Sequence, residues 1–212
     1  PFFAAFRAGL AAQCRRADPR IGLLTPGRFN PSYPEQAHLA RYLGLLLVEG
    51  ADLAALEDKV YVRTIGGLKR IDALWRRLDP RLLDPLAFDT HSQIGVPGLI
   101  DAYAAGNVVL SNAPGSAVLE APAFSAFLPN LAKSLLGEDL LLPNIATWWC
   151  GQTAAKESVE ASFDRLLIGP AFHARPLGMT GGPTAGADIT GTARAALLAD
   201  MANRPQDYVG QE

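Results

Sequence analysis

The alternation of apolar and polar segments between residues 21 and 48 constrains the fold more than any other feature. Residues 21–24, Ile-Gly-Leu-Leu, form an apolar run of strand length, and residues 25–31 have the proline and glycine content of a loop. A helical pattern follows as far as Leu43, and residues 45–48 are a second short apolar run. This order predicts a strand–helix–strand unit, whose two strands pair in parallel through a right-handed crossover.

The start of the helix in this unit carries its own pattern. Ser32 and Glu35 have the spacing of a capping box, in which the serine hydroxyl accepts an amide three residues on and the glutamate reaches back. Pro34 suits the first helical turn, where its missing N–H costs nothing. Gly44 predicts the end of the helix. The sequence therefore predicts a helix that begins just after Ser32.

Further elements extend this pattern along the chain. Residues 60–64 and 68–71 flank Ile65-Gly66-Gly67 and predict a β-hairpin with glycines at its turn. The fold class predicted is α/β, with an open, largely parallel sheet flanked by helices. Strands are also expected at residues 73–77, 107–111, 166–168 and 208–212, helices at 2–12, 98–105, 121–136, 153–163 and 190–203, and a long loop at 173–188.

Composition excludes several classes of protein. The chain is 49% hydrophobic and 19% charged, with a formal net charge of -2, which indicates a globular protein and gives no basic surplus for binding nucleic acid. No apolar run approaches the roughly 20 residues that span a bilayer, and we expect no membrane association. Cys14 and Cys150 lie outside any C-x-x-C pair, which favours a reducing, cytoplasmic compartment. The first residue is not Met and the last residues fit a strand, so we interpret the sequence as a piece of a longer protein.

Well-known catalytic and metal-binding patterns are not found in the sequence. It contains no H-E-x-x-H, G-x-S-x-G or Walker A motif, and its three histidines are isolated from one another. No metal ligands are predicted within these residues. Trp148-Trp149 could stack on a base, but packing at a domain seam is the interpretation we favour.

The loop that follows the first strand is a candidate ligand site. In open α/β sheets, ligands bind beyond the carboxyl ends of the strands, and the amides at a helix start favour an anion. Thr25, Gly27, Arg28 and Asn30 are the candidate phosphate- or substrate-binding residues there. The alternative is a structural turn of the kind found in every α/β fold.

Two other segments follow predicted strands and could line the same site. Arg76 and Arg77 could bind a carboxylate or phosphate, although adjacent residues of a strand point to opposite faces and at most one would enter a given cleft. Their alternative is a surface ion-pair cluster. Asn112 and Ser116 are the candidate residues at the two ends of a short polar segment that contains Gly115. The backbone of this segment could approach a ligand closely. The alternative is a plain turn.

Together these segments resemble one family, the circularly permuted ATP-grasp proteins of type 2, which are similar to glutathionylspermidine-synthase-like peptide ligases. The resemblance extends from about Arg20 to the end of the chain. It is carried, in this order, by Leu23-Leu24-Thr25-Pro26-Gly27-Arg28-Phe29-Asn30, Leu47-Val48-Glu49-Gly50-Ala51-Asp52-Leu53, Trp75-Arg76-Arg77-Leu78-Asp79, Leu83-Asp84-Pro85-Leu86, Gly95-Val96-Pro97-Gly98-Leu99 and Ala146-Thr147-Trp148-Trp149-Cys150-Gly151.

The resemblance implies ATP-dependent ligation of a carboxylate to an amine through an acyl phosphate, with Mg²⁺ as cofactor. It implies an N-terminal helix over residues 1–19, a pre-ATP-grasp-like α/β domain over 20–151 and part of a nucleotide-clamping α+β subdomain over 152–212. Arg76 and Arg77 would take the catalytic positions. The partners implied are a nucleotide, a small peptide-like or amine substrate, and further domains of the longer protein. Gln211 and Glu212 would lie where such proteins hold adenine.

The sequence departs from the family pattern at two places. Related proteins often carry a cation where this chain has Leu119-Glu120-Ala121-Pro122, and another where it has Gly169-Pro170. Both cations would face nucleotide phosphates, and Arg175 could substitute for them. These departures leave a second hypothesis open, a degenerate ATP-grasp module that binds a nucleotide or a protein partner without catalysis.

Overall fold

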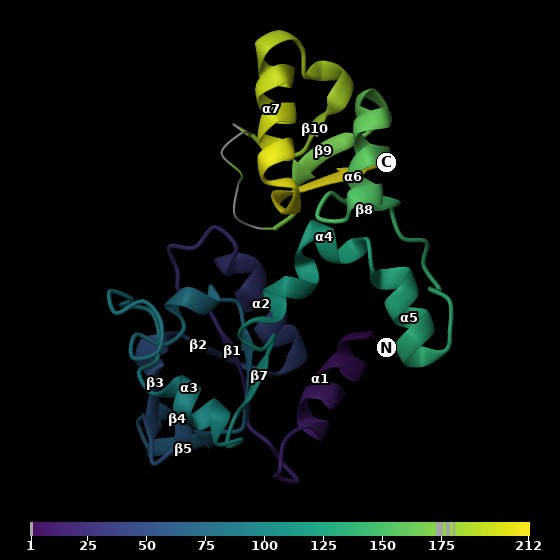
Figure 1. Ribbon diagram of the computed structural model, residues 1–212. Helices are drawn as coiled ribbons and strands as arrows, with labels where there is room; N and C mark the ends of the chain where they lie inside the picture. Colours follow the sequence, from purple (N-terminus) through teal and green to yellow (C-terminus); the bar gives the residue numbers. More distant parts are fainter. Residues whose placement is uncertain (1, 173–175, 177–178, 180) are drawn as a thin grey trace. The chain divides into compact units, whose positions relative to one another are not determined.

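The computed structural model describes residues 2–172, 176, 179 and 181–212 (Figure 1). The chain divides into two compact units, Pro1–Gly115 (unit 1) and Ser116–Glu212 (unit 2). Each unit has its own sheet and its own buried core. The predicted boundary near Gly151 falls inside unit 2, between β8 (Thr147–Trp149) and α6 (Thr153–Ala161).

Unit 1 is built on the parallel sheet that the sequence predicts. Its strands are β1 (Ile21–Leu24), β2 (Leu46–Val48), β6 (Ala73–Arg76) and β7 (Val109–Ser111). They lie in the order β2-β1-β6-β7, and every neighbouring pair is parallel. The predicted strand–helix–strand unit is therefore confirmed, with α2 (Tyr33–Leu43) as its crossover (Figure 1).

Helices cover one face of this sheet. The side chains of Ile21 and Leu23 point to that face and pack with Leu10 of α1 (Phe2–Ala12) and with Leu43 of α2. Because successive residues of a strand point to opposite faces, Leu24 belongs to the other core. The apolar faces of α1 and α2 thus pack against alternate residues of the parallel sheet.

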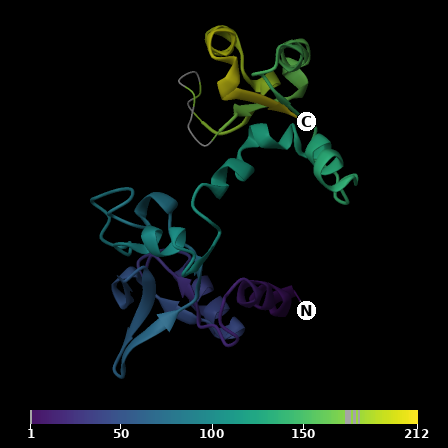
Figure 2. The ribbon, with the colours of Figure 1, turned by 60° about the horizontal axis from the view of Figure 1, so that its bottom comes forward.

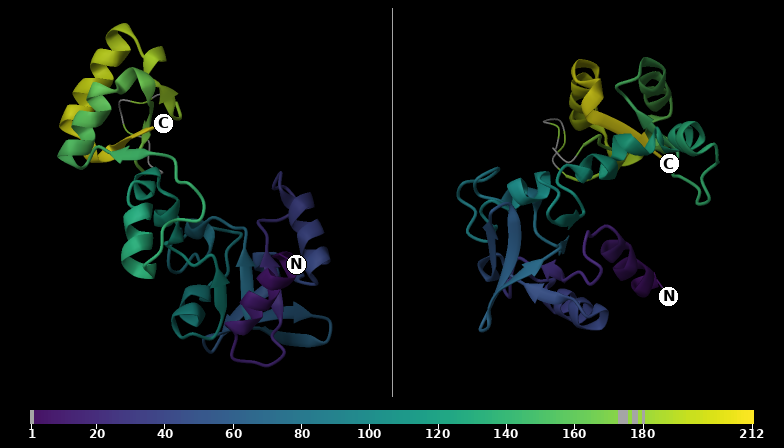
Figure 3. Two further views of the ribbon diagram at one scale, coloured as in Figure 1. Left: turned by 90° about the vertical axis from the view of Figure 1, so that its right-hand side faces the viewer. Right: turned by 90° about the horizontal axis from the view of Figure 1, so that it is seen from below.

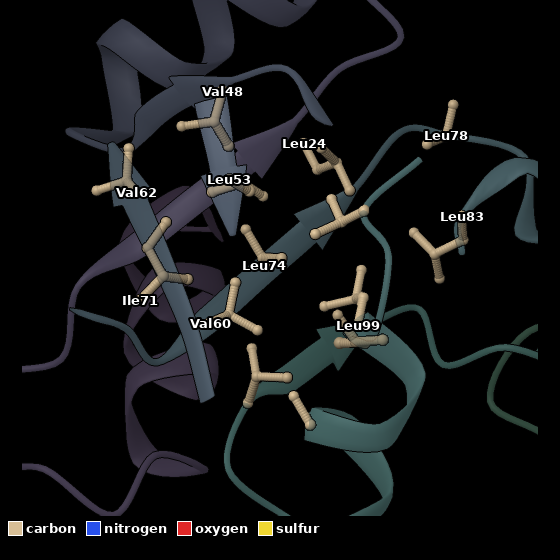
Figure 4. Close-up of a cluster of buried hydrophobic side chains, with 14 residues drawn as sticks. Leu24, Val48, Leu53, Val60, Val62, Ile71, Leu74, Leu78, Leu83 and Leu99 are labelled. Carbon is tan, nitrogen blue, oxygen red and sulfur yellow. The ribbon is translucent and has the colours of Figure 1, made fainter. Parts of the chain in front are cut away.

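The opposite face is covered by a second, antiparallel sheet and by α3 (Leu99–Ala104). This sheet has the order β3-β4-β5 and contains β3 (Leu53–Leu56), β4 (Lys59–Thr64) and β5 (Gly67–Ile71). Figure 4 shows Leu24, Leu74 and Leu99 pointing into one cluster between the parallel sheet and these elements. The β4–β5 hairpin was predicted and extends from unit 1 (blue in Figure 2); β3 was not predicted.

The predicted capping box at α2 is wrong. Ser32 is the N-cap residue, but its side chain makes no capping hydrogen bond. Its N–H instead donates to Asn30 Oδ1 at 2.9 Å, and the Glu35 carboxylate faces Arg77 at 3.2 Å. The Ser32 N–H and the Glu35 carboxylate, which a capping box would join, are therefore bonded to Asn30 in an Asx turn and to Arg77. Pro34 in the first turn and the left-handed Gly44 at the C-cap, with φ 66°, agree with prediction.

Unit 2 contains an antiparallel sheet with helices on both faces. The order is β10-β9-β11-β8, with β9 (Leu167–Pro170), β10 (Thr184–Ala185) and β11 (Tyr208–Gln211). Tyr208 packs with residues of α6 and α7 (Gly191–Asn203), while the next residue, Val209, packs with Ala123 of α4 (Pro122–Ser125) on the other face. Figure 3 shows α6 and α7 beside each other against this sheet.

The helix predicted over residues 121–136 is broken into α4 and α5 (Leu128–Leu136). Pro129 explains the break, because it has no N–H to donate to the carbonyl of Ser125. The Asn144 side chain takes that carbonyl instead, with its Nδ2 donating at 2.7 Å. The remaining short elements are 3-10 turns, η1 (Gly50–Asp52), η2 (Pro80–Leu82), η3 (Ser116–Glu120), η4 (Phe163–Arg165), η5 (Gly186–Asp188) and η6 (Pro205–Asp207).

Residues 181–188, predicted as part of a long loop, include β10 and η5. Among the described residues, no helix has both the length and the apolar character needed to cross a membrane.

Candidate functional site

The carboxyl ends of the parallel strands in unit 1 gather polar residues from four segments. Thr25 follows β1, Glu49 follows β2, Arg77 follows β6 and Asn112 follows β7. Since parallel strands end at one edge of a sheet, these residues share that edge, which we call the carboxyl edge. The structure thus brings the predicted residues at the ends of β1, β6 and β7, apart from Ser116, to one side of the unit 1 sheet.

Thr25 fixes the first of these loops from inside the protein. Its hydroxyl donates to Gln36 Oε1 at 2.5 Å, and both side chains are buried. The same oxygen accepts the Gly27 N–H at 3.2 Å. The Thr25 N–H donates to the Val48 carbonyl at 2.9 Å, which joins the loop to β2. The loop therefore has a defined geometry set by buried polar contacts.

Gly27 brings the loop close to an acidic group. Its φ of 105° lies in the region that favours glycine, and a Cβ there would lie 3.0 Å from Glu49 Oε2. The Glu49 N–H in turn donates to the Asp52 carboxylate at 2.9 Å. The loop therefore faces a carboxylate, which opposes an anion at this point and would attract a cationic or amine group.

Arg28 and Asn30 have different roles in the same loop. The Arg28 side chain is exposed and lies over the Phe29 ring, with its Cζ 4.9 Å from the ring centroid. Asn30 uses its side chain to shape the turn, since its Oδ1 accepts the Ser32 N–H. Arg28 is therefore the residue that presents positive charge from this loop.

Arg76 and Arg77 have separate partners. Arg76 Nε donates to the Asn112 carbonyl at 3.0 Å, and its Nη1 donates to the Leu78 carbonyl. Arg77 Nη2 lies 3.2 Å from Glu35 Oε1, and its Cζ is 5.6 Å from the centroid of the Trp75 ring. Arg76 thus ties together the loops after β6 and β7, whereas Arg77 forms a partly exposed ion pair at the start of α2.

A buried carboxylate organises the chain beyond β6. Asp84, 1% exposed, accepts the N–H groups of Leu86 at 2.9 Å, Gly98 at 3.2 Å and Ile100 at 2.9 Å. Asp79 caps η2, and its pKa is held below the ordinary value by the backbone N–H and guanidinium of Arg81. Both residues stabilise the loops that lead away from the carboxyl edge.

The remaining predicted residues lie in unit 2 or outside the described residues. Ser116 is the first residue of η3 and of unit 2. Gln211 Nε2 donates to Thr147 Oγ1 at 3.1 Å, and Glu212 lines a cavity of about 400 Å³ together with Trp148 and Arg165. Arg175 lies outside the described residues. Trp148 and Trp149 pack on opposite faces of the unit 2 sheet.

The described residues contain neither a cluster of candidate metal ligands nor a reactive thiol near the predicted site residues. Within the residues that the structure describes, no three His, Cys, Asp or Glu side chains form a group suited to a metal ion. Burial raises the pKa of the Cys150 thiol to about 11, so this cysteine stays protonated at neutral pH.

Sequence reasoning missed Gln36 and Glu49 as part of the carboxyl edge. Gln36 shares its helix face with Ala40 and Leu43, which are also buried. A polar residue on an apolar stripe at the i, i+4, i+7 spacing was the pattern that could have identified it. Nothing in the sequence indicated that Glu49 would approach Gly27, because that contact depends on the pairing of β1 with β2.

Comparisons with known proteins identify a family and several relatives of this chain. The family model described as circularly permuted ATP-grasp type 2 matches residues 1–212. Similar proteins include the uncharacterized protein sll0335 of Synechocystis sp. (strain ATCC 27184 / PCC 6803 / Kazusa), 35% identical over 92% of this chain and 40% of that protein. Two others, Rv2411c and Rv2567 of Mycobacterium tuberculosis (strain ATCC 25618 / H37Rv), are also uncharacterized and are 36% and 37% identical.

This chain spans only a part of each of these relatives. The matched region covers 95% of the chain and 36% of Rv2411c, and 100% of the chain and 23% of Rv2567. Because the family model matches the chain over its whole length, the chain belongs to the circularly permuted ATP-grasp type 2 family.

Proposed function

We propose that this chain is part of an ATP-dependent ligase that joins a carboxylate to the amine of a small peptide-like or amine substrate. In the proposed reaction a carboxylate oxygen attacks the γ-phosphorus of ATP and ADP departs. The amine nitrogen then attacks the acyl carbon, phosphate leaves, and the nitrogen loses a proton. The observation that carries the proposal is the family match, supported by the polar residues gathered at the carboxyl edge of unit 1.

Charge at the carboxyl edge supports a site that receives both an anion and an amine. Arg28 and Arg77 supply positive charge, and guanidinium groups bind carboxylates and phosphates through paired hydrogen bonds. Glu49, beside Gly27, supplies the negative charge that an ammonium group requires. Arg76 is a positioning residue in this proposal, because its donors hold backbone carbonyls of two neighbouring loops.

In unit 2, the cavity beside Trp148 is the proposed binding site for the base of the nucleotide. Its volume of about 400 Å³ and its lining by Trp148, Arg165 and Glu212 combine an aromatic surface with hydrogen-bonding groups. The Glu212 N–H donates to the Ala146 carbonyl at 3.1 Å, which fixes the backbone beside the cavity. We place adenine here and propose residues 152–212 as part of the nucleotide-clamping subdomain.

The described residues fit ATP better than they fit Mg²⁺. Mg²⁺ prefers several oxygen ligands in octahedral geometry, and the described residues form no group of three candidate ligands. We therefore derive no step through the metal from this chain. Its ligands would come from further domains of the longer protein, which we propose to act in the cytoplasm.

A second proposal is a degenerate module that binds a nucleotide or a protein partner without catalysis. Ala121 is 3% exposed, so this position presents no cation to a ligand. Gly169 is also buried, and a Cβ there would lie 3.2 Å from the Pro183 ring. The Pro183 ring therefore leaves little room for a longer side chain at position 169.

Calorimetry on the full-length protein tests the nucleotide site. We expect ADP to bind with and without Mg²⁺, and we expect Glu212→Ala to weaken binding about tenfold or more, as for the loss of a charged hydrogen bond. Glu157→Ala is the matched control, because it removes the same charge from an exposed position of α6. No heat on addition of ADP, or equal affinity of the two variants for ADP, would contradict the proposed nucleotide site.

Hydroxylamine trapping separates the two proposals. An acyl phosphate reacts with hydroxylamine to give a hydroxamate and phosphate. Full-length protein incubated with ATP, Mg²⁺, hydroxylamine and a panel of amino acids and peptides should therefore form a hydroxamate and release ADP if it is a ligase. Nucleotide binding without any hydroxamate across the panel would favour the non-catalytic module.

A further inference from the structure

A second polar cavity lies in unit 1, at the edge where the parallel strands begin. It has a volume of about 180 Å³. Its walls come from the segment after α1, from the end of β5 and from the start of β7. The residues that matter for its chemistry are Cys14, Arg15, Arg16, Arg70, Asp72 and Asn107. None of these is among the residues of the carboxyl edge, so the two places are independent.

One carboxylate faces several cations in this cavity. Asp72 is 5% exposed, and its Oδ2 accepts the Arg20 N–H at 2.8 Å and lies 3.3 Å from Arg16 Nη1. Its other oxygen lies 3.6 Å from Arg70 Nε. The Asp72 carboxylate is therefore occupied on both oxygens. It balances one of the three guanidinium charges that line the cavity.

The other donors are placed by the backbone. Arg70 Nη2 donates to the Asn107 carbonyl at 3.0 Å, which holds the guanidinium against the cavity wall. Arg15 Nη2 lies 3.1 Å from the position that a Cβ would take on Gly106, a residue with φ 67°. Among the described residues, no ion pair joins Arg15 to a carboxylate. Gly106 therefore makes room for a cation that forms no ion pair with any described carboxylate.

This arrangement favours an anion. Like charges held together repel one another, and a bound anion removes that repulsion while using the parallel N–H donors of guanidinium groups. The cavity volume of about 180 Å³ is enough for a tetrahedral oxyanion with a few waters. A phosphate group is the oxyanion that matches both the charge and the size.

The cysteine in the cavity does not suggest a different chemistry. Cys14 Sγ, just after α1, donates to the carbonyl of Leu10 in that helix at 3.4 Å. Burial and the Asp72 carboxylate both raise the pKa of this thiol, so it is less nucleophilic than an ordinary cysteine. Cys14 is therefore a packing residue at the cavity wall, and it provides a built-in reporter of occupancy.

We propose that the Arg15–Arg16–Arg70 cavity binds a phosphate group, either as inorganic phosphate or as the end of a small phosphomonoester. The site lies at the opposite end of the strands from the carboxyl edge and goes beyond the proposed ligase function.

The test uses the whole chain, inorganic phosphate and two matched variants. Arg15→Gln removes an exposed cation from the cavity, and Arg63→Gln removes one from an exposed position of β4. At constant ionic strength, we expect phosphate to bind the wild type and Arg63→Gln equally and Arg15→Gln about tenfold more weakly, since one charged hydrogen-bond donor is lost. Equal affinities in all three proteins, or no heat in the wild type, would overturn the proposal.

Alkylation of the thiols gives a second readout. Iodoacetamide is uncharged, so phosphate can slow its reaction with Cys14 only by occupying or closing the cavity. We expect several-fold protection of Cys14 by phosphate in the wild type and none in Arg15→Gln, with Cys150 in unit 2 unaffected. Protection of both cysteines alike would overturn the assignment. Glycerol phosphate in place of phosphate distinguishes the two sources. Equal protection by both compounds favours a phosphomonoester whose remainder stays outside the cavity, and weaker protection by glycerol phosphate favours inorganic phosphate.

Discussion

The buried Thr25–Gln36 pair offers the sharpest test of how the carboxyl edge is held. Thr25 is 0% exposed and Gln36 is 2% exposed, and their oxygens lie 2.5 Å apart. The Thr25 oxygen also accepts the Gly27 N–H. Thr25→Val keeps the shape of the side chain and removes both contacts. It leaves the Gln36 carbonyl and the Gly27 N–H without partners in a buried place.

The magnitude follows from those two groups. An unsatisfied buried polar group costs about 1–3 kcal/mol, so two of them should destabilise the protein by about 2–6 kcal/mol. Gln36→Met alone should cost less, because the Thr25 hydroxyl can turn to other acceptors, such as nearby backbone carbonyls. Thr25→Val combined with Gln36→Met replaces both partners by apolar groups. The double variant should therefore be more stable than the sum of the two losses predicts, by about 1–2 kcal/mol.

Hydrogen exchange measured on peptides is the suitable assay, because the two units can open separately and a single unfolding curve would mix them. Amides of β1 and β6 report on unit 1, and those of β9 and β11 serve as the internal reference. Thr25→Ser is the control, since it keeps the hydroxyl and loses one methyl group. Strict additivity of the two substitutions would refute the hydrogen bond as the source of the effect.

Four other outcomes follow from the structure. Cys150, with a pKa near 11, should react with iodoacetamide at pH 8 far more slowly than Cys14, and equal rates in the folded chain would contradict the burial described for it. Asp84→Asn should destabilise unit 1 by about 1–3 kcal/mol in hydrogen exchange, because an amide NH₂ would face backbone N–H donors. Gly50→Ala should cost about 1–3 kcal/mol or more, since its Cβ would lie 2.2 Å from a backbone carbonyl oxygen. Because the pKa of Asp79 is lowered in the folded protein, its carboxylate stabilises the fold above the ordinary carboxyl pKa, and this stabilisation is lost as the pH falls through the lowered pKa. Asp79→Ala should therefore lower the free energy of unfolding by about 0.5–2 kcal/mol at pH 7, and by less at pH 3.

The elements that the sequence predicted well are those set by local pattern. The apolar runs at residues 21–24 and 45–48, with a helix between them, sufficed to predict a parallel pair, which the pairing of β1 with β2 confirms. Gly44 marked the helix end for a local reason as well, since its left-handed conformation suits glycine.

Features that depend on tertiary contacts were beyond the sequence. The Ser32–Glu35 spacing fitted a capping box, but Arg77, which follows β6, pairs with the Glu35 carboxylate, and Asn30 accepts the Ser32 N–H. Pro129 alone indicates a break between α4 and α5, but the apolar periodicity continues across it and favours a single helix. The positions of unit 2 residues such as Gln211 within an antiparallel sheet depend on which strands pair.

The two edges of the parallel sheet differ in how their arginines are used, and this difference decides how any phosphate binding must be interpreted. At the carboxyl edge, Arg76 holds backbone carbonyls and Arg77 is paired with Glu35, so an incoming anion must compete with existing partners. At the opposite end of the strands, which we call the amino edge, three guanidinium groups line one cavity and two of them share the buried Asp72 carboxylate, so a bound anion relieves their repulsion. Phosphate bound by this chain would therefore go first to the amino edge. Binding that survives Arg15→Gln and disappears with Arg77→Gln would instead assign it to the carboxyl edge, where the ligase proposal needs it.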